Sequence, residues 1–544
     1  MAVTVDVPAL AGGRAVGAAP GDGPSGALTA VSIAVAAAFL GPMAYLLVRV
    51  SGVDGIGATL GEAETWVPLR STLTLAVAVA AACAVVGTGL AWLTTRTDLP
   101  ARRLWAVAAA LPLVYPSFIG AAALLAAIAP GGIFDELVPG VRADSLPTIE
   151  GFSGSFVVLT LFTYPYVYLP VAARVGSLPP SYEESARLLG HSGWRVFRGV
   201  VLPQIAGAIW AGTLLVFLYV VSDFGAVAQM RYRTLSVEIF ESQIFDRDRS
   251  LVLGALLGVV ALAVVALERA VNRRRNRVEV ARAKRPLQVP LGRWRWPALV
   301  AVAFLAANAL IGPLSVLGYW AIRGITGSRR LGGADVADLA EPAATTAGLS
   351  LAAAVIAVVA VLPVAFLTAR HRSRVGGAVN AAVVGGFALP GLIVALSLVF
   401  WTLSGPSWTG GLYQSVPILL AAYVVHFGAQ AMRASQVAVA GVPRRLEDAA
   451  RSLGAGRIRR FRSVELPLML PGLLAGGGLV LLSTMKELPA TLLLRPTSID
   501  TLAVRVWRAR EAARWSETGL ASLVLVALSA VLTWMLVVRR ASRF

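Results

Sequence analysis

Two carboxylic acids lie beside apolar stretches in which charged side chains are rare. Asp223 stands in the sequence VVSDFGA and Glu487 in LSTMKELPA, and their positions differ by 264 residues. A charged side chain at the centre of a bilayer costs roughly 2.5–3.5 kcal/mol on insertion scales, so a recurring acid indicates a polar pathway or a paired charge. Two other interpretations stay open: each acid lies in water at the outer end of its helix, or Lys486 neutralises Glu487. We assign Asp223 and Glu487 to a polar pathway because the acid recurs.

The same offset relates two polar segments. Glu183–Pro203 reads EESARLLGHSGWRVFRGVVLP and Glu447–Pro467 reads EDAARSLGAGRIRRFRSVELP, with 11 of 21 aligned positions identical and no gap. Both segments are too polar to cross a membrane, so lipid-facing composition cannot explain the match. Self-similarity at a fixed period indicates duplicated architecture. Six apolar stretches separate the copies, so both emerge on the same side and the repeat is parallel.

Each copy has the pattern of a helix, a glycine turn and a second amphipathic helix. Acids at Glu183 and Glu447 suit the first turn of a helix, and Gly190 and Gly454 can supply the left-handed turn that ends it. The Leu-Pro pair that closes each copy is expected to open the next membrane span. A single loop of this kind would be interpreted as a solvated connection, but two matching copies on one face favour a docking surface. The residues assigned to that surface are Glu183, Glu184, Ala186, Gly190, Pro203, Glu447, Asp448, Ala449, Ala450, Gly454 and Pro467.

Several kinds of chemistry are excluded or unsupported by residue type. Cys83 is the only cysteine, which rules out an intramolecular disulfide and a cysteine metal cluster. The three histidines are scattered, no metal site is assigned, and no nucleophile–base spacing indicates an enzyme. The sequence contains no Gly-Lys dipeptide, so a phosphate-binding loop of the GxxxxGK[ST] type is impossible.

Composition identifies the chain as a membrane protein. Of its 544 residues 57% are hydrophobic and only 14% are charged, against roughly 25% charged in soluble domains. About 20 apolar residues form one membrane-spanning helix. The sequence therefore predicts an all-α, polytopic membrane protein with about twelve transmembrane helices, built as two parallel six-helix repeats. The predicted spans are 27–48, 71–93, 104–129, 154–175, 204–222, 251–271, 297–320, 345–369, 378–403, 415–433, 468–485 and 520–538.

The arginines set the expected orientation. The net charge is +19, but the basic residues cluster in short loops between apolar stretches, which indicates a positive-inside bias and not a nucleic-acid-binding domain. Both loops of the repeat and both termini are then cytoplasmic. The predicted organisation comprises a disordered cytoplasmic tail (1–26), a first six-span domain (27–271, loop 178–203), a basic cytoplasmic linker (272–296) and a second six-span domain (297–540, loop 442–467).

Two prolines fall inside predicted spans. Pro116 in LVYPSFIG and Pro390 in FALPGLIV each lie in the third span of their half. A proline frees a backbone carbonyl and usually kinks a helix. The kinks could shape a pathway or serve only the packing of the bundle.

The two repeated loops resemble the EAA loop of binding-protein-dependent ABC importer permeases, in which Glu-Ala-Ala is followed by a glycine and then a hydrophobic-proline ending. The matching residues are Glu184, Ser185, Ala186, Gly190 and Pro203 in the first copy, and Asp448, Ala449, Ala450, Gly454 and Pro467 in the second. Ser185 and Asp448 depart from the pattern conservatively. The resemblance covers nearly the whole chain after the tail and implies a permease whose halves are fused and open alternately to either side of a bacterial cell (plasma or inner) membrane.

Further implications of the resemblance concern partners and substrate. A separate cytoplasmic ATPase dimer, which carries the ATP and Mg²⁺, would dock on the two loops, and an extracytoplasmic binding protein would deliver substrate; this chain itself would hold no cofactor. The segment Met485–Trp507, together with SDFGA at 222–226, resembles the fused permeases of ferric iron importers. Iron is therefore the expected substrate, with thiamine or a phosphonate as alternatives within the same class.

The oxygen-bearing side chains of the spans are compatible with an iron substrate but do not identify iron as the substrate. A hard trivalent cation prefers carboxylate and phenolate oxygen, which Asp223, Glu487 and the tyrosines of TYPYVY (Tyr164, Tyr166 and Tyr168) could offer. Tyrosines in a span also serve as packing or interfacial anchors. An ion-coupled secondary transporter is the alternative of a different class, although it would not need two matched cytoplasmic loops.

Overall fold

The computed structural model describes residues 24–54, 56–137, 149–273, 288–326, 335–371, 373–386, 389–533 and 535, and most of these residues lie in helices. The first half contains α1 (Gly26–Ser51), α2 (Ile56–Gly61), α3 (Ala63–Arg96), α4 (Arg102–Ala110), η1 (Leu111–Val114), α5 (Ser117–Ile128), α6 (Ile133–Leu137), α7 (Phe152–Thr163), α8 (Pro165–Gly176), α9 (Pro180–Leu188), α10 (Gly193–Val196), η3 (Phe197–Val201), α11 (Leu202–Ser222), α12 (Gly225–Gln229), α13 (Leu235–Phe245) and α14 (Arg247–Arg273). The second half contains η4 (Gly292–Trp294), α15 (Arg295–Ala306), η5 (Ala307–Ile311), α16 (Gly312–Thr326), η7 (Ala337–Leu339), α17 (Ala340–Arg370), α18 (Arg374–Gly386), α19 (Gly391–Ser404), η8 (Ser407–Leu412), α20 (Val416–Gly441), α21 (Arg444–Ser452), α22 (Arg457–Arg460), η9 (Phe461–Glu465), α23 (Leu466–Met485), α24 (Pro489–Leu494), α25 (Leu502–Glu511) and α26 (Trp515–Thr533). The predicted tail and most of the linker lie outside the described residues.

The prediction of an all-α, multi-pass membrane protein is confirmed. Within the described residues, eleven helical segments are long and apolar enough to cross a membrane, and the bent pair α18–α19 raises the number to twelve. The observed helices overlap all twelve predicted spans. Several are longer than predicted, since α3 and α17 continue to Arg96 and Arg370 at their polar ends.

The third span of each half is broken, where the sequence predicted only a kink. In the first half α4 and η1 end before Pro116, which is the N-cap of α5. In the second half α18 and α19 are bent by 98° relative to each other, and Pro390 is the N-cap of α19. Proline has no N–H to donate and disfavours helical geometry in the residue before it. The single span predicted at 104–129 is therefore two helices.

Three long helices form the centre of each half. In the first half α3, α8 and α11 pack on one another, and in the second half α17, α20 and α23 do so. Small residues let the backbones approach closely. A Cβ at Gly87 of α3 would lie 2.8 Å from Val167 Cβ and 2.9 Å from the backbone nitrogen of Tyr168, both in α8. A Cβ at Gly476 of α23 would likewise lie 2.7 Å from Ala434 Cβ in α20.

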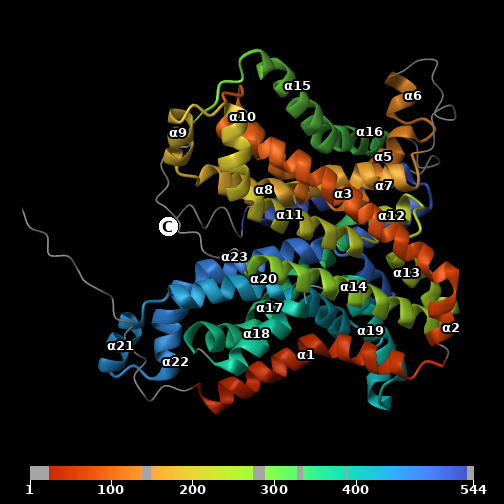
Figure 1. Ribbon diagram of the computed structural model, residues 1–544. Coiled ribbons are helices and arrows are strands. Elements are labelled where there is room, and N and C mark those ends of the chain that lie inside the picture. The colour runs from red at the N-terminus through yellow and green to blue at the C-terminus, as the bar shows by residue number, and fades with distance from the viewer. Residues whose placement is uncertain are drawn as a thin grey trace, which may run out of the picture.

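The first span of each half packs against the other half. Figure 1 shows α1 along the edge formed by α18 and α17, with α15 and α16 along the opposite edge beside the first half. The ring of Phe39 in α1 lies against Gly428 of α20, and Trp320 Nε1 of α16 donates to the carbonyl of Ala126 in α5 at 2.9 Å. Separating the halves would therefore also remove α1 from its contacts with the second half and α16 from its contacts with the first.

We expect Gly87→Val to lower the stability of the folded protein by about 1–3 kcal/mol, because the added side chain collides with the backbone of α8. Thermal unfolding of the detergent-solubilised chain measures the effect. Gly89→Val is the matched control, since Gly89 lies on the same helix with no atom near its Cβ position. Equal melting temperatures for the two variants would contradict the close α3–α8 contact.

Candidate functional site

The two repeated loops form the same helix–turn–helix structure. Helices α9 and α21 begin after Pro179 and Pro443 and are followed by glycines in the left-handed region, Gly190 at φ 79° and Gly454 at φ 76°. In the first loop the N–H of Gly190 donates to the carbonyl of Arg187 at 2.9 Å, and the next N–H donates to the carbonyl of Ala186 at 3.2 Å. The second loop repeats both bonds. This Schellman arrangement satisfies the last carbonyls of each short helix, as the glycine spacing predicts.

The Leu-Pro ending of each loop lies where the long α-helix of the next span begins, as predicted, but no break in the chain precedes it. The chain runs without interruption from α10 through the π-helical turn η3 into α11, and from α22 through η9 into α23. Leu202 and Leu466 follow these π-helical turns directly, and Pro203 and Pro467 come one residue later. A proline ring clashes with the carbonyl four residues earlier, and a widened turn relieves the clash while the helix continues.

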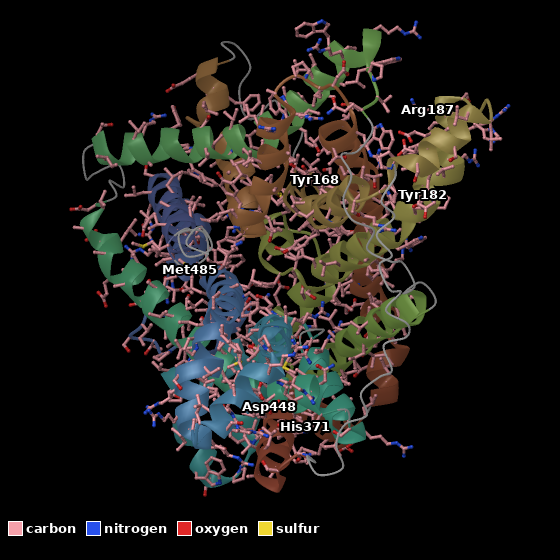
Figure 2. The ribbon with its side chains drawn as sticks, turned by 90° about the vertical axis from the view of Figure 1, so that its left-hand side faces the viewer. Tyr168, Tyr182, Arg187, His371, Asp448 and Met485 are labelled. Atoms are coloured by element: carbon pink, nitrogen blue, oxygen red, sulfur yellow. The ribbon has the colours of Figure 1, made fainter. Side chains whose placement is uncertain are left out.

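Both loops lie at one end of the helical bundle, which we call the loop end. Figure 1 places α9 and α10 beside that end of the first half and α21 and α22 at the same end of the second. Figure 2 views the loop end directly, with Tyr182 and Arg187 of α9 and Asp448 of α21 labelled on one face. A parallel duplication places both loops at the same end of the bundle, as the sequence predicted.

An ion pair, buried in the first half and partly exposed in the second, joins each loop to the longest helix of its half. Arg96, the last residue of α3, contacts Glu183 at 2.9 Å, and the two side chains are 0% and 3% exposed. Arg370, the last residue of α17, contacts Glu447 at 2.5 Å, with exposures of 14% and 15%. The two matching copies predicted both glutamates as part of a docking surface, and the arginine partners were not predicted. The available signal was that each arginine ends the second apolar stretch of its half.

An aromatic contact provides a second anchor. Phe197 and Phe461 occupy equivalent places in the repeat, and each ring contacts an aromatic ring on the long helix of its half. Phe197 lies 5.0 Å from Trp92 of α3 between ring centroids, and Phe461 lies 6.2 Å from Phe366 of α17. Each loop therefore contacts the long helix of its half through both a charge pair and an aromatic pair.

The outer faces of the loops carry exposed apolar side chains. Leu188 and Leu453 are each 88% exposed, and Trp194 and Ile458 are 68% and 75% exposed. Large apolar groups exposed together at a polar surface mark an interaction site. Of the other residues predicted for the docking surface, some are buried against the bundle and some are exposed on the outer face. Ala186 and Ala450 are buried, whereas Glu184, Asp448 and Ala449 are exposed.

The end of the interdomain linker is fixed beside the first loop. The N–H of Val289 donates to the carbonyl of Arg96 at 2.7 Å, and the N–H of Leu291 donates to Asp98 Oδ1 at 2.8 Å. The linker therefore touches the same residue that anchors Glu183, which ties the start of the second half to the first loop.

The two acids of the predicted pathway occupy matching places but make different bonds. Asp223 follows α11, and its carboxylate accepts from the Ser117 hydroxyl and from the N–H groups of Ala226 and Val227 at 3.0 and 3.4 Å. Glu487 follows α23, and its Oε1 accepts from the N–H of Ala490 at 3.2 Å. Each acid lies one residue before the N-cap of the short helix that follows, α12 or α24, and accepts from an N–H of its first turn.

The segments that carry these acids meet where the halves touch. The added Cβ position at Gly225 lies 3.3 Å from a methyl group of Leu488, and the rings of Phe224 and Trp507 are 5.3 Å apart between centroids. Lys486 Nζ crosses from the second half and donates to the carbonyl of Leu113 at 2.8 Å. The lysine thus binds a carbonyl in the broken third span of the first half, so it is not held as a partner of Glu487.

A further bond crosses between the halves beyond these acids. An Nη atom of Arg510 in α25 donates to the carbonyl of Gln229 at the end of α12 at 3.2 Å. Burial lowers the pKa of the Arg510 guanidinium from its ordinary value.

The tyrosines considered as oxygen ligands are occupied in packing. Tyr164 and Tyr168 are 1% and 3% exposed, and the Tyr168 hydroxyl donates to the carbonyl of Ala106 at 3.2 Å. The ring of Tyr166 lies 5.6 Å from that of Tyr219 between centroids. Within the described residues, no group of three or more His, Cys, Asp or Glu side chains is arranged to hold a metal ion.

Comparison with known proteins identifies the family. The family described as "Binding-protein-dependent transport system inner membrane component" matches the chain twice, at residues 96–277 and 361–543. The chain belongs to this family. Each match includes one helix–turn–helix loop and one pathway acid, so this fused permease contains both membrane domains of the importer class. The resemblance recognised in the sequence is confirmed.

Individual relatives differ in the substrates that their names state. The Fe(3+)-transport system permease protein FbpB 2 of Haemophilus influenzae is 28% identical over 474 residues, which cover 86% of this chain and 89% of the relative. The sulfate transport system permease protein CysW of Escherichia coli is 29% identical over 246 residues, 42% of this chain and 80% of its own length. The molybdenum transport system permease protein ModB of Mycobacterium tuberculosis is 30% identical over 208 residues, 36% of this chain and 77% of its own length. Among these three, the similarity to the ferric iron permease extends over both halves.

We expect Glu183→Ala to destabilise the first loop by about 3–5 kcal/mol, because Arg96 is left buried without its carboxylate partner. Glu447→Ala should cost less, since water reaches the second pair. Thermal unfolding and the rate of tryptic cleavage at Arg187 in α9 measure the two effects. Glu184→Ala on the exposed face of α9 is the control, and wild-type cleavage and melting for Glu183→Ala would contradict the anchoring role.

Proposed function

We propose that this permease is the transmembrane subunit of an ATP-binding-cassette importer that moves ferric iron. An extracytoplasmic binding protein delivers the iron, and a separate cytoplasmic ATPase dimer drives the transport. The proposal rests above all on the two matched helix–turn–helix loops that lie at one end of the bundle and are anchored to α3 and α17. Membership in the family of binding-protein-dependent permeases supports the same conclusion.

The loops are the proposed ATPase contacts, and their residues take two roles. Glu184, Asp448 and Ala449 are exposed and would contact the ATPase directly. Exposed apolar side chains such as Leu188 and Leu453 would do the same. Two inward-facing acids, Glu183 and Glu447, pass displacement of the loops to the long helices through their arginine partners. The remaining residues hold each loop in shape: Ala186 and Ala450 are buried, Gly190 and Gly454 form the turns, and Pro203 and Pro467 start the long helices.

This assignment makes the loop end cytoplasmic, as the arginine bias also indicates. Both termini and the linker are then cytoplasmic in a bacterial cell membrane. The binding protein would contact the opposite end of the bundle. ATP and Mg²⁺ belong to the partner ATPase in this scheme, and the chain itself holds no cofactor.

The interface between the halves is the proposed translocation pathway, with Asp223 and Glu487 as its acidic residues. The breaks before Ser117 and Gly391, the two acids and the Lys486 bond to Leu113 all lie in the segments through which the halves meet. Broken helices tolerate irregular backbone at membrane depth only where it is buried in protein or lines a cavity. Movement of one half against the other would change these contacts first.

Ferric iron is the proposed substrate for two reasons. The similarity to the Haemophilus influenzae iron permease covers 86% of this chain, and carboxylate oxygen suits a hard cation. Two acids in the pathway would repel a sulfate or molybdate anion. Thiamine, a cation, remains the alternative for an importer of this class, and the same repulsion disfavours a phosphonate.

We expect ATPase activity to rise when the chain is reconstituted with its partner ATPase and with the binding protein loaded with ferric iron. Sulfate, molybdate, thiamine and a phosphonate serve as parallel loads of the corresponding binding proteins. Stimulation by one of these other loads alone would retain the importer and refute iron. A chain that associates with no ATPase would be an ion-coupled secondary transporter.

We expect the double variant Gly190→Val, Gly454→Val to insert in the membrane normally but to lose coupled ATP hydrolysis. A β-branched residue at these positive φ angles costs about 1–3 kcal/mol per site, while the absence of atoms near either Cβ position excludes a steric effect. Asparagine tolerates the left-handed region, so Gly190→Asn with Gly454→Asn should restore coupling. Equal coupling in the valine and glycine proteins would refute the role of the loops.

A further inference from the structure

Two basic side chains of the second half bind carbonyl groups of the first half. Lys486, the residue after α23, donates from Nζ to the carbonyl of Leu113 at 2.8 Å. Arg510 in α25 donates from an Nη atom to the carbonyl of Gln229 at 3.2 Å. Each acceptor lies at the end of a short helical segment, η1 or α12. Carbonyls at a helix end lack partners within the helix, so a donor from outside stabilises them.

Pro116 explains why the carbonyl of Leu113 needs an outside donor. In a 3₁₀ segment such as η1, a carbonyl accepts from the N–H three residues later. For Leu113 that residue is Pro116, which has no N–H. A carbonyl removed from water without a donor costs free energy, and Lys486 supplies the donor that the proline cannot. The bond therefore stabilises the arrangement in which the two halves touch.

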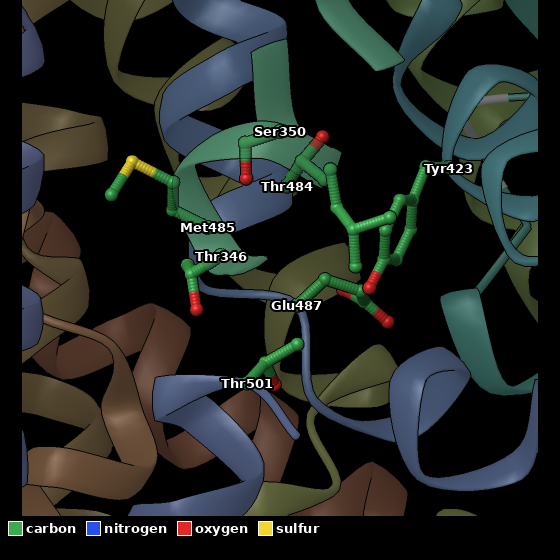
Figure 3. A pocket seen from close by; sticks show the side chains of 8 residues that line it. Thr346, Ser350, Tyr423, Thr484, Met485, Glu487 and Thr501 are labelled. Carbon is green, nitrogen blue, oxygen red and sulfur yellow. The ribbon is translucent and has the colours of Figure 1, made fainter. Parts of the chain in front are cut away.

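The residues on either side of Lys486 face their own half. Met485 and Glu487 both line a small cavity formed by residues of the second half. Figure 3 shows the Glu487 carboxylate beside Tyr423, with Met485 on the other side of the cavity. The Lys486 side chain instead crosses to the first half. Lys486 thus joins the halves, while the acid next to it lies within the second half.

The two bonds border a line of contact between the halves, which we call the seam. Between the two donors in the sequence, a methyl group of Leu488 lies 3.3 Å from the Cβ position at Gly225, and the ring of Trp507 lies 5.3 Å from that of Phe224 between centroids. Helices α11 and α23 begin beside the loops and end where the seam begins. Figure 1 accordingly places α12 far from α9 and α21. The seam therefore lies toward the end of the bundle opposite the loops.

The first half has a neutral residue at the position of Lys486. The 264-residue offset that relates Asp223 to Glu487 also relates Ser222 to Lys486. The Ser222 hydroxyl donates to the carbonyl of Leu218 in its own helix at 2.8 Å. The serine thus makes its bond within α11, whereas the lysine reaches the other half.

The first half also has a neutral residue at the position of Arg510. The N–H groups of Leu235 and Leu502, which begin α13 and α25, each donate at 2.9 Å to a threonine of the longest helix of their half. These bonds relate α13 to α25 by an offset of 267 residues (502 minus 235). Gln243 therefore corresponds to Arg510. At both positions the basic donor comes from the second half.

We propose that Lys486 and Arg510 act together as an outer clamp, which keeps the end of the pathway opposite the loops closed until the binding protein engages. Both are positioning residues and contact no substrate in this role. Each bond joins one half to the other, so the halves cannot separate at the seam without breaking it. Water that enters the opened seam can hydrate the released donors and carbonyls, so opening leaves no buried polar group without a partner. The proposal rests on the proposed importer function and adds the residues that close its outer end.

We expect Lys486→Met and Arg510→Met each to raise ATP hydrolysis in the absence of the binding protein about fivefold or more in the reconstituted complex with the ATPase. The closed arrangement loses one bond in each variant, while methionine still fills the space along the seam. Lys486→Arg keeps a donor and should retain the low wild-type rate. The matched control is Ser222→Ala, which changes the equivalent position of the first half and should also leave the rate unchanged. Wild-type basal hydrolysis in the double variant Lys486→Met, Arg510→Met would overturn the clamp.

The distance between the halves tests the clamp without the importer's partners. Cys83 is the only cysteine and is buried, so spin labels can be attached to introduced cysteines. Glu241→Cys in α13 and Ala512→Cys after α25 place the labels at exposed positions on the two halves. In the purified full chain, we expect one narrow label distance with the clamp intact and an added longer distance in the double methionine variant. Thermal unfolding shows whether each labelled variant is folded.

The outcomes separate the clamp from the importer. An unchanged label distance in the folded double variant would overturn the clamp and leave the importer intact. A complex whose ATPase no loaded binding protein stimulates would refute the importer, while the label distances still decide the clamp. If the double variant does not fold, the two single variants, each of which keeps one of the bonds, decide the clamp by the same distance.

Discussion

The bilayer supplies no water to the backbone, and this constraint organises the whole molecule. Every N–H and C=O at membrane depth must find a partner inside the protein, so the described chain is helical and its irregular segments are confined to protein-lined places. The breaks before Ser117 and Gly391 and the turns at Asp223 and Glu487 are such segments. They gather where the two halves meet, because there the partner half can satisfy what the break exposes. The bond from Lys486 to the carbonyl of Leu113 is a direct instance.

The attachment of the first loop to α3 depends on a buried charge pair. Two charges are expensive to remove from water unless they meet each other with good geometry, and the Arg96–Glu183 contact satisfies that condition with almost no exposed surface. The pair fixes the first loop on α3, and the linker binds the carbonyl of the same arginine through Val289. Arg96 is therefore in contact with the first loop and with the linker that leads to the second half. The second pair is partly open to water, so the two loops are alike in shape and unequal in strength.

Duplication followed by divergence explains the remaining asymmetry. The paired threonines Thr72 and Thr346 keep identical bonds, which shows that the framework is retained. Nearby equivalent positions differ in polarity: Ala76 and Val220 of the first half correspond to Ser350 and Thr484 of the second, whereas Ser117 of the first half corresponds to Gly391. A framework that holds its shape through main-chain and threonine bonds permits such changes at neighbouring positions, because the helices stay in place whichever side chain lines the gap.

The sequence by itself determined the class, the number of spans, the parallel duplication and the helix–turn–helix shape of the loops. Apolar length, the 264-residue offset and the glycine positions are local signals that report on local structure. Only the tertiary structure decided which side chains meet. Arg96 reaches Glu183 across 87 positions, Lys486 reaches Leu113 of the other half, and α1 packs on the second half. Such contacts depend on how helices far apart in the sequence pack together, and no periodicity along the chain encodes that. The same reason explains why Pro116 and Pro390 predicted a kink and the structure shows a break: a neighbouring half must be present to satisfy the freed backbone groups.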